Sequence, residues 1–322
     1  GHSNVAVGKF ALRYNTTGQE NTALGSMALI TNTTASDNVA VGRQTMYANT
    51  TGAQNTALGA YALDASTTGL DNTALGTYSL GANTTASYNT AVGRSALTSN
   101  TTGASNTAVG HKAGYSNTTA TEMTAVGIEA LYSNTTGNTN SALGRRALYS
   151  TTTGVNNAGF GARTLYTNTT GSYNVSIGMD SLYSNTTASN NTAVGYFALY
   201  ANTTGTRNVA VGASSLDANT TGNYNIAVGN VSLGANTTGS ENTALGDYAL
   251  ADNTTGAQNV AVGKQALGQN TTASDNTAVG FESLMDNTTG TNNTAVGKRA
   301  GYNITTGDDN TAIGQEALYT AT

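Results

Sequence analysis

Residues 89–105 read NTAVGRSALTSNTTGAS, and this stretch decides the fold because the chain repeats its pattern from end to end. We number the positions of each repeat 1 to 17, with Asn4 at position 1 of the first full repeat. Gly1–Ser3 fall in frame as the end of a preceding repeat, and 18 full repeats run without insertion from Asn4 to Asp309, followed by a partial one. Fixed periods of this length are typical of solenoids, in which each repeat forms one coil. The unbroken frame predicts one continuous array over residues 1–322, and the lack of atypical capping repeats predicts a segment of a longer fibre.

The composition is neither that of a large globular core nor that of a disordered chain. Hydrophobic residues make up 38% and charged residues 9%, the net charge is −5, and Pro, Cys and Trp are absent. Disorder normally combines low hydrophobicity with high net charge. The 12 basic and 17 acidic residues form no basic stripe for nucleic acid, and no apolar run is long enough to cross a membrane. Without cysteine there is no disulfide or thiolate metal site, so order must come from the repeat itself.

Glycine at position 5 is the most constant feature of the repeat. It is present in all 19 repeats even where its neighbours change, which indicates a backbone requirement: a positive φ or a close approach of neighbouring coils. We therefore predict that these glycines occupy equivalent corners of the coil: Gly8, Gly25, Gly42, Gly59, Gly76, Gly93, Gly110, Gly127, Gly144, Gly161, Gly178, Gly195, Gly212, Gly229, Gly246, Gly263, Gly280, Gly297 and Gly314.

The apolar positions of the repeat predict the strands. Position 3 is nearly always Ala, position 4 is always apolar, and position 9 is Leu in most repeats. Runs at positions 2–4 and about 8–10, separated by Gly and small polar residues, predict two strands per coil. Abundant Gly, Asn and Thr without a 3.6-residue stripe argue against helix. We predict an all-β fold, a parallel β-solenoid or β-roll of about 19 coils, in which Asn and Thr form columns at a spacing of about 4.8 Å and the rod is roughly 90 Å long.

The NTAVGxxA pattern, as in residues 89–96, resembles the head repeats of trimeric autotransporter adhesins of the YadA type and similar arrays in phage tail-fibre-like proteins. The likeness covers the whole chain, although the adhesin repeats are a few residues shorter and lack the Asn-Thr-Thr-Gly block. The resemblance implies a left-handed parallel β-roll with three chains side by side. It also implies an extracellular location, at a cell surface or on a virion.

A thin core in each coil also favours self-association, and we expect a homotrimer rather than a monomeric solenoid. The alanine column at position 3 would let a neighbouring chain approach closely. We therefore expect the position-3 alanines to lie on one continuous face, buried in the oligomer and partly exposed in a single chain; examples are Ala57, Ala91, Ala125, Ala193 and Ala227.

No residue pattern indicates catalysis. His2 and His111 are about six coils apart, and Asp308-Asp309 and Arg145-Arg146 lie at positions that vary freely between repeats. The glycine spacings lack the Lys-Ser or Lys-Thr of a phosphate-binding loop, and a rod of similar coils offers no deep pocket. We therefore predict no enzyme activity, no metal and no cofactor.

Tyrosine recurs at position 10, and the run from Tyr132 to Tyr200 predicts an aromatic ladder about 20 Å long. Stacked rings could stabilise the rod, or an exposed aromatic strip could contact glycans or other fibres. Both interpretations stay open from the sequence. The tyrosines concerned are Tyr47, Tyr115, Tyr132, Tyr149, Tyr166, Tyr183, Tyr200, Tyr302 and Tyr319.

The Asn-Thr-Thr block forms an N-glycosylation sequon in most repeats, with Asn at position 12 and Thr at position 14. The same block also suits a turn, because Asn tolerates left-handed backbone geometry. Either interpretation predicts that positions 12 and 14 face solvent. Ser66, Thr151 and Ile304 interrupt the series, and the candidate glycosylation sites are Asn15, Asn32, Asn49, Asn83, Asn100, Asn117, Asn134, Asn168, Asn185, Asn202, Asn219, Asn236, Asn253, Asn270, Asn287 and Asn303.

Together these features predict a structural repeat segment of an extracellular fibre, stalk or adhesin shaft that supplies length and stiffness. The alternatives are a Thr- or Tyr-ladder surface that binds glycans or ice, and a glycosylated extracellular filament. Ice recognition requires Thr side chains on one flat face, whereas adjacent positions 13 and 14 of an extended chain point to opposite faces. That geometry argues against an ice-binding face made of both Thr columns.

Overall fold

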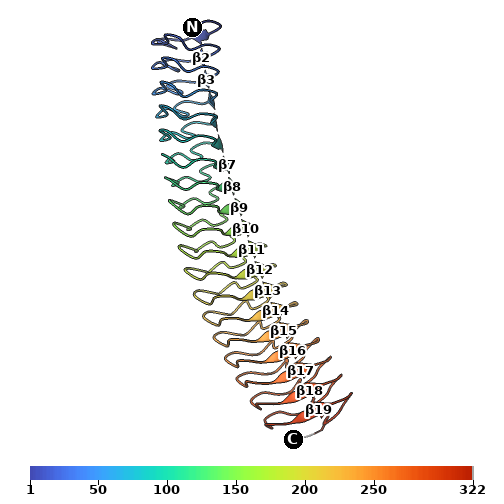
Figure 1. The fold of residues 1–322 in the computed structure, drawn as a ribbon. Coiled ribbons are helices and arrows are strands. Elements are labelled where there is room, and N and C mark those ends of the chain that lie inside the picture. The colour runs from blue at the N-terminus through green and yellow to red at the C-terminus, as the bar shows by residue number, and fades with distance from the viewer. Residues whose placement is uncertain (321–322) are drawn as a thin grey trace. The chain divides into compact units, whose positions relative to one another are not determined.

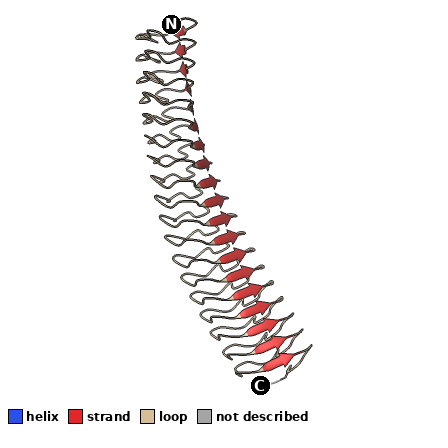
Figure 2. Ribbon diagram, viewed as in Figure 1, coloured by secondary structure: helices blue, strands red, loops and turns tan. Residues whose placement is uncertain are grey.

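The computed structural model describes residues 1–320 and divides the chain into two compact blocks, Gly1–Ala162 and Arg163–Thr322. Each block is a stack of coils with one three-residue strand per coil, at positions 2–4 (Figures 1 and 2). Residues 1–320 contain no helix, and so none that could span a membrane.

The strands of the N-terminal block are β1 (Val5–Val7), β2 (Thr22–Leu24), β3 (Val39–Val41), β4 (Thr56–Leu58), β5 (Thr73–Leu75), β6 (Thr90–Val92), β7 (Thr107–Val109), β8 (Thr124–Val126), β9 (Ser141–Leu143) and β10 (Ala158–Phe160). Those of the C-terminal block are β11 (Val175–Ile177), β12 (Thr192–Val194), β13 (Val209–Val211), β14 (Ile226–Val228), β15 (Thr243–Leu245), β16 (Val260–Val262), β17 (Thr277–Val279), β18 (Thr294–Val296) and β19 (Thr311–Ile313).

Within each block, every strand pairs in parallel and in register with the strand one coil away. In the C-terminal block, for example, Ala193 of β12 lies opposite Ala210 of β13, and the same register continues to β19. The predicted parallel β-solenoid is therefore confirmed. That residues 1–322 form one continuous array stays a prediction from the sequence.

The prediction of a second strand at positions 8–10 is wrong. Leu at position 9 has a φ of about 50°, as in Leu97 (50°) and Leu131 (49°), which is left-handed backbone and not strand. Positions 7 and 17 also have positive φ, as in Ser95 (58°) and Ser105 (59°). These reversals turn the chain around the closed coil. The backbone there still bonds to the next coil, since the Leu97 amide donates to the Ala113 carbonyl at 3.0 Å.

The position-5 glycines are equivalent, as predicted. Their φ values all lie between 121° and 141°, a region that residues with a side chain rarely adopt. Neighbouring coils also meet closely at this corner. A Cβ on Gly93 would lie 2.5 Å from the carbonyl oxygen of Gly110 in the next coil, closer than any real contact. Both requirements that the constant glycine suggested therefore apply at once.

The core of each block is thin and lies inside the coil. It consists of the small residues at positions 3 and 8, the leucines at position 9, and asparagine columns at positions 1 and 12. The prediction that the position-3 alanines form a partly exposed face is wrong, because successive strand residues point to opposite sides and position 3 points inward. All five named examples are fully buried in the single chain: Ala57, Ala91, Ala125, Ala193 and Ala227.

Two coils have glycine in place of leucine at position 9, and each compensates with a large apolar residue elsewhere in the core. Gly114 is accompanied by Met123, which replaces the asparagine at position 1, and a Cβ on Gly114 would lie 2.7 Å from the Met123 Cε. Gly301 is accompanied by Ile304 at position 12, whose Cδ1 would lie 3.1 Å from the added Cβ. The coil therefore keeps its core volume although the residue that supplies it changes.

Candidate functional surfaces

The candidate glycosylation asparagines at position 12 point into the core. The Asn100 side-chain amide donates to the Gly103 carbonyl at 2.9 Å and to the Asn83 Oδ1 at 3.0 Å. Asn100, Asn134 and Asn202 are all 0% exposed, so the prediction that position 12 faces solvent is wrong. Each amide donates to the carbonyl at position 15 of its own coil, and most also donate to the asparagine Oδ1 of the preceding coil; sequence alone does not reveal those partners.

Burial removes most of these residues as sites for a sugar on the folded chain. Of the candidates, only Asn15 and Asn303 are half-buried, and the others are fully buried. A glycan on a buried Asn would also break the amide bonds to two neighbouring coils. We therefore do not propose these sequons as glycosylation sites of the folded protein.

The position-12 ladder is interrupted at the three full repeats that lack Asn there. The Oδ1 atoms of Asn49, Asn134 and Asn287 are buried and have no hydrogen-bond partner. Each of these residues lies one coil before a break, at Ser66, Thr151 and Ile304 respectively. The acceptor is therefore left unpaired wherever the next coil supplies no amide.

The two threonine columns differ in what their hydroxyls do. At position 13 the hydroxyl donates to the backbone of the next coil, as from Thr101 Oγ1 to the Thr118 carbonyl at 3.0 Å. At position 14 the side chain is exposed, as in Thr102 and Thr119, which confirms that prediction. A ligand face made of both columns is therefore disfavoured, because the position-13 hydroxyls already bond to the fold.

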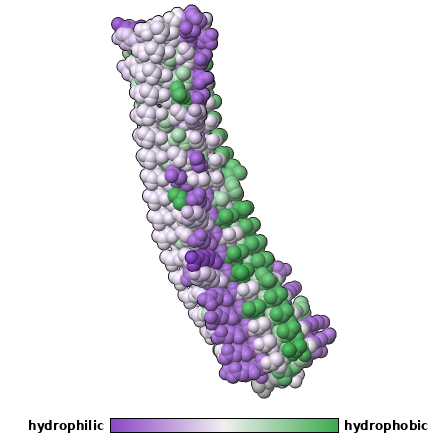
Figure 3. All heavy atoms as spheres, viewed as in Figure 1, coloured by the Kyte–Doolittle hydropathy of each residue, from purple (hydrophilic) through white to green (hydrophobic). Residues whose placement is uncertain are grey.

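Charge is confined to one part of the coil surface. All Lys, Arg, Asp and Glu residues lie at positions 6, 7, 10, 11, 16 and 17. The outward positions of the strands, 2 and 4, carry none, and position 4 is always apolar. In the single chain these apolar side chains are exposed or half-exposed, and the most exposed include Val7 (61%), Leu58 (51%) and Ile313 (71%). We call this uncharged strip, made of positions 2 and 4, the sheet face. In the C-terminal block Figure 3 shows it as a band of hydrophobic residues over the strands.

The predicted tyrosine ladder is present within each block. Tyr115, Tyr132 and Tyr149 stack in the N-terminal block with ring centroids 5.1 Å apart, and the stack Tyr166, Tyr183 and Tyr200 in the C-terminal block has spacings of 5.1 and 5.3 Å. The rings are nearly parallel and half-buried, so each covers the faces of its neighbours.

Position-7 cations lie beside these rings. The Arg146 guanidinium is 5.7 Å from the Tyr149 ring centroid and forms an ion pair with Glu129 at 2.7 Å. The Arg163 guanidinium lies at the same distance from the Tyr183 ring and pairs with Asp180 at 2.6 Å. These contacts favour the stabilising interpretation of the ladder, because inside a stack the ring faces are not open to a sugar.

Carboxylates occupy position 10 in two coils that lack tyrosine there. Burial raises the pKa of Asp64 and of Asp217, although backbone hydrogen bonds oppose the shift. Asp308 behaves in the opposite way, because its hydrogen bonds from the Thr291 backbone and hydroxyl lower its pKa.

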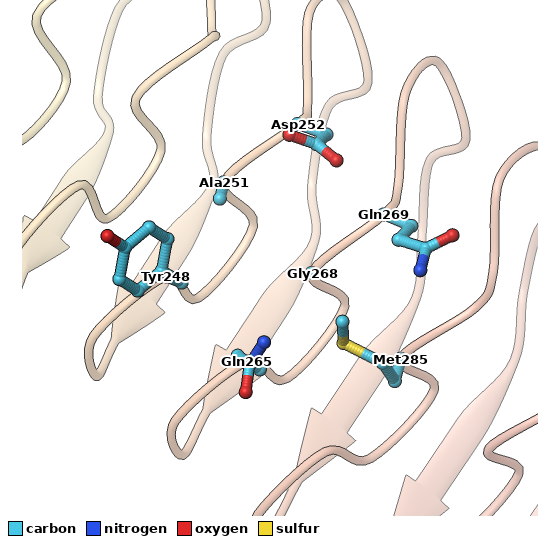
Figure 4. Close-up of a pocket in the computed structure, with 7 residues that line it drawn as sticks. All are labelled: Tyr248, Ala251, Asp252, Gln265, Gly268, Gln269 and Met285. Atoms are coloured by element: carbon cyan, nitrogen blue, oxygen red, sulfur yellow. The ribbon is translucent and has the colours of Figure 1, made fainter.

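A small open groove of about 230 Å³ lies on the C-terminal block. Figure 4 shows Tyr248 and Met285 at its two ends, with Ala251 and Gly268 between them. Polar side chains complete its lining: Asp252, Gln265 and Gln269.

The remaining candidate residues do not converge on a site. His2 and His111 lie in separate parts of the N-terminal block, and no group of three His, Asp or Glu within residues 1–320 could hold a metal ion. No protein-family profile matches the chain, and no curated protein is significantly similar to it. The adhesin likeness therefore rests on the repeat motif alone.

Proposed function

We propose that the chain is a structural repeat segment of an extracellular fibre, stalk or adhesin shaft, to which it gives length and stiffness. The observation that carries the proposal is that each coil is hydrogen-bonded to the next on every side. In the coil 89–105, amides at positions 2, 9, 11 and 13 donate forward, for example Thr90 to Asn106 at 2.8 Å and Thr101 to Thr118 at 2.9 Å. Amides of the next coil donate back, as Lys112 does to Arg94 at 3.0 Å. Bending such a stack in any direction stretches hydrogen bonds.

The surface chemistry supports an exposed structural role over catalysis. The groove is small and open, and the stacked threonine and tyrosine side chains contact neighbouring coils and are not available to a substrate. The extracellular location in this proposal, outside the cell or on a virion, comes from the adhesin resemblance.

We further propose that the fibre is a homo-oligomer, with a homotrimer as the expected state, and that its contact is the sheet face. Position 4 is apolar in all 19 repeats although its side chains are exposed or half-exposed in the single chain, whereas positions 16 and 17 vary freely. Contiguous apolar surface of this kind normally marks an interface. A second copy of the chain is the partner that fits this face, because its own sheet face is also uncharged, repeats with the same 17-residue period and has the same length.

The available area sets a condition on this contact. A three-residue strand at a coil spacing of about 4.8 Å offers roughly 50 Å² per coil, and so roughly 500 Å² per block. A stable interface usually buries about 800 Å² per partner. Assembly therefore needs the sheet faces of both blocks.

The rod proposal is tested by lengthening the array. Duplicating residues 174–258, which are five whole repeats, is expected to lengthen the particle by about 24 Å without changing its width, because each coil adds about 4.8 Å. Electron microscopy and small-angle scattering measure both dimensions. Duplicating residues 174–250 is the control, because it breaks the 17-residue frame. A particle that widens or becomes compact on in-frame duplication would overturn the rod.

A further inference from the structure

Positions 7 and 10 of neighbouring coils share one strip of surface that usually holds an aromatic ring in each coil. In the repeats without tyrosine at position 10, a ring often stands at position 7, as in the stacked pair Tyr61 and Tyr78 with centroids 5.0 Å apart. Tyr248 follows the same rule, because its own coil has Ala251 at position 10. A ring stands at one of the two positions in 13 of the 19 repeats, and the repeats that begin at residues 21, 89, 208, 225, 259 and 276 have none.

The coil 259–275 has a ring at neither position, because it carries Gln265 at position 7 and Gly268 at position 10. The groove of about 230 Å³ lies at this gap. At one end stands Tyr248, 45% exposed, on whose ring no other ring of residues 1–320 stacks. At the other end Met285 leans over Gly268, since a Cβ on this glycine would lie 2.7 Å from the Met285 sulfur. The next coil, 276–292, also has no ring at position 7 or 10 and carries Met285 at position 10, so the groove is a slot that runs from the Tyr248 ring to the Met285 side chain.

Polar side chains around the slot indicate what kind of ring fits it. Figure 4 shows Asp252 and Gln269 on one side of the slot and Gln265 on the other. The Gln269 amide nitrogen donates to Asp286 Oδ1 at 3.2 Å, which leaves its oxygen as an acceptor. A carboxylate and two amides supply donors and acceptors for hydroxyl groups, and an open tyrosine face suits the C–H groups of a sugar ring. A purely aromatic ligand would make no hydrogen bonds to these polar groups.

We propose that this slot binds a single saccharide ring, packed on Tyr248 and hydrogen-bonded by Asp252, Gln265 and Gln269. The binding is non-covalent and does not depend on the role of the chain as a fibre, so it stands or falls separately from the proposed function.

The test is saturation-transfer NMR on the full chain with three probes: methyl α-D-glucopyranoside, methyl α-D-galactopyranoside and N-acetyl-D-glucosamine. At least one is expected to bind. Gly268→Tyr restores the missing ring and should abolish binding, and Tyr248→Ala should weaken it by about tenfold through loss of the aromatic platform. Gly81→Tyr is the matched control, because it adds the same ring at position 10 in the N-terminal block, where a Cβ has ordinary contacts of 3.4 Å or more. It should leave binding unchanged.

Thermal unfolding checks that each variant folds, and position 10 already accepts tyrosine in other coils. The proposal is overturned if none of the three sugars binds, or if Gly268→Tyr binds as well as the wild type. It is also overturned if p-cresol, an aromatic probe, binds the slot and the sugars do not.

Discussion

At the scale of single residues, asparagine does in this fold what large apolar side chains do in a globular core. Its amide is short enough to stay inside a narrow coil. It donates both to the position-15 carbonyl and to its copy in the preceding coil, as Asn202 does to Gly205 at 2.9 Å and to Asn185 at 3.0 Å. Aspartate would stack like charges at about 4.8 Å in a dry column. Buried polar groups are tolerated here because they are paired.

The breaks in the ladder predict a stabilising substitution. Ser66→Asn is expected to raise the free energy of unfolding by about 1 kcal/mol, because it supplies a donor to the unpaired Asn49 Oδ1 and removes the unpaired Ser66 hydroxyl. Denaturant unfolding measures the difference. Ser99→Asn at half-exposed position 11 is the control and should change stability by less than about 0.5 kcal/mol. A neutral or destabilising Ser66→Asn would contradict the ladder argument.

Asp217 predicts a dependence of stability on pH. Because burial raises its pKa in the folded state, its ionised form opposes folding at neutral pH, and the chain gains stability as pH falls through the raised pKa toward 3.8. Asp217→Asn should therefore raise the unfolding temperature at pH 7 and lose that advantage over the wild type near pH 3.5. Melting curves at both pH values check this, with exposed Asp275→Asn as the control. An advantage that is equal at both pH values would show that the titration of Asp217 plays no part.

At the scale of the coil, the sequence predicts the features that depend on the repeat period. It mispredicts two positions, 9 and 12, at which the residue type normally indicates a different backbone or a different exposure. The period, the position-5 corner and the parallel stacking follow from spacing and from glycine. The second strand does not form, because the leucines at position 9 have positive φ, and leucine normally signals strand or helix. Only Gly114 and Gly301, with φ values of 60° and 61°, reveal that geometry in the sequence. The burial of position 12 could not be predicted from the sequence either, because asparagine is usually exposed. The backbone carbonyls that accept hydrogen bonds from these asparagines come close only in the folded coil.

The exchange of core residues between positions predicts a coupled pair. Gly114→Leu should destabilise the coil, because the added Cβ would lie 2.7 Å from Met123 Cε, and Met123→Asn should destabilise it by leaving a cavity. The double variant restores the usual pattern of Leu at position 9 and Asn at position 1. We expect its stability to exceed the sum of the single effects by about 0.5 to 3 kcal/mol, measured by a double-mutant cycle. Additive effects would mean that the two side chains do not share one space.

At the scale of the whole molecule, the surface consists of a variable part, which carries the charges and the tyrosines, and the uncharged sheet face. Charges and the tyrosine strip occupy positions that vary, while in the sheet face position 2 is always uncharged and position 4 is apolar in every repeat. A solvent-facing column should accept polar residues as positions 16 and 17 do. The constancy of position 4 therefore argues for a partner that covers it, since position 4 points away from the core of its own chain.

A covered sheet face predicts which charged substitutions the assembly cannot accept. Val228 and Leu245 at position 4 are each 38% exposed in the single chain, so Val228→Lys combined with Leu245→Lys should leave the coil folded. In a covered sheet face the two ammonium groups would be buried without partners, which costs several kcal/mol and should dissociate the oligomer. Ala213→Lys combined with Asn230→Lys is the control, because position 6 is exposed here and carries lysine in other coils, as at Lys264. Light scattering counts the copies per particle and thermal unfolding confirms the fold. A wild-type chain that is monomeric would overturn self-association, and an oligomer that survives the sheet-face lysines would place the contact on another surface.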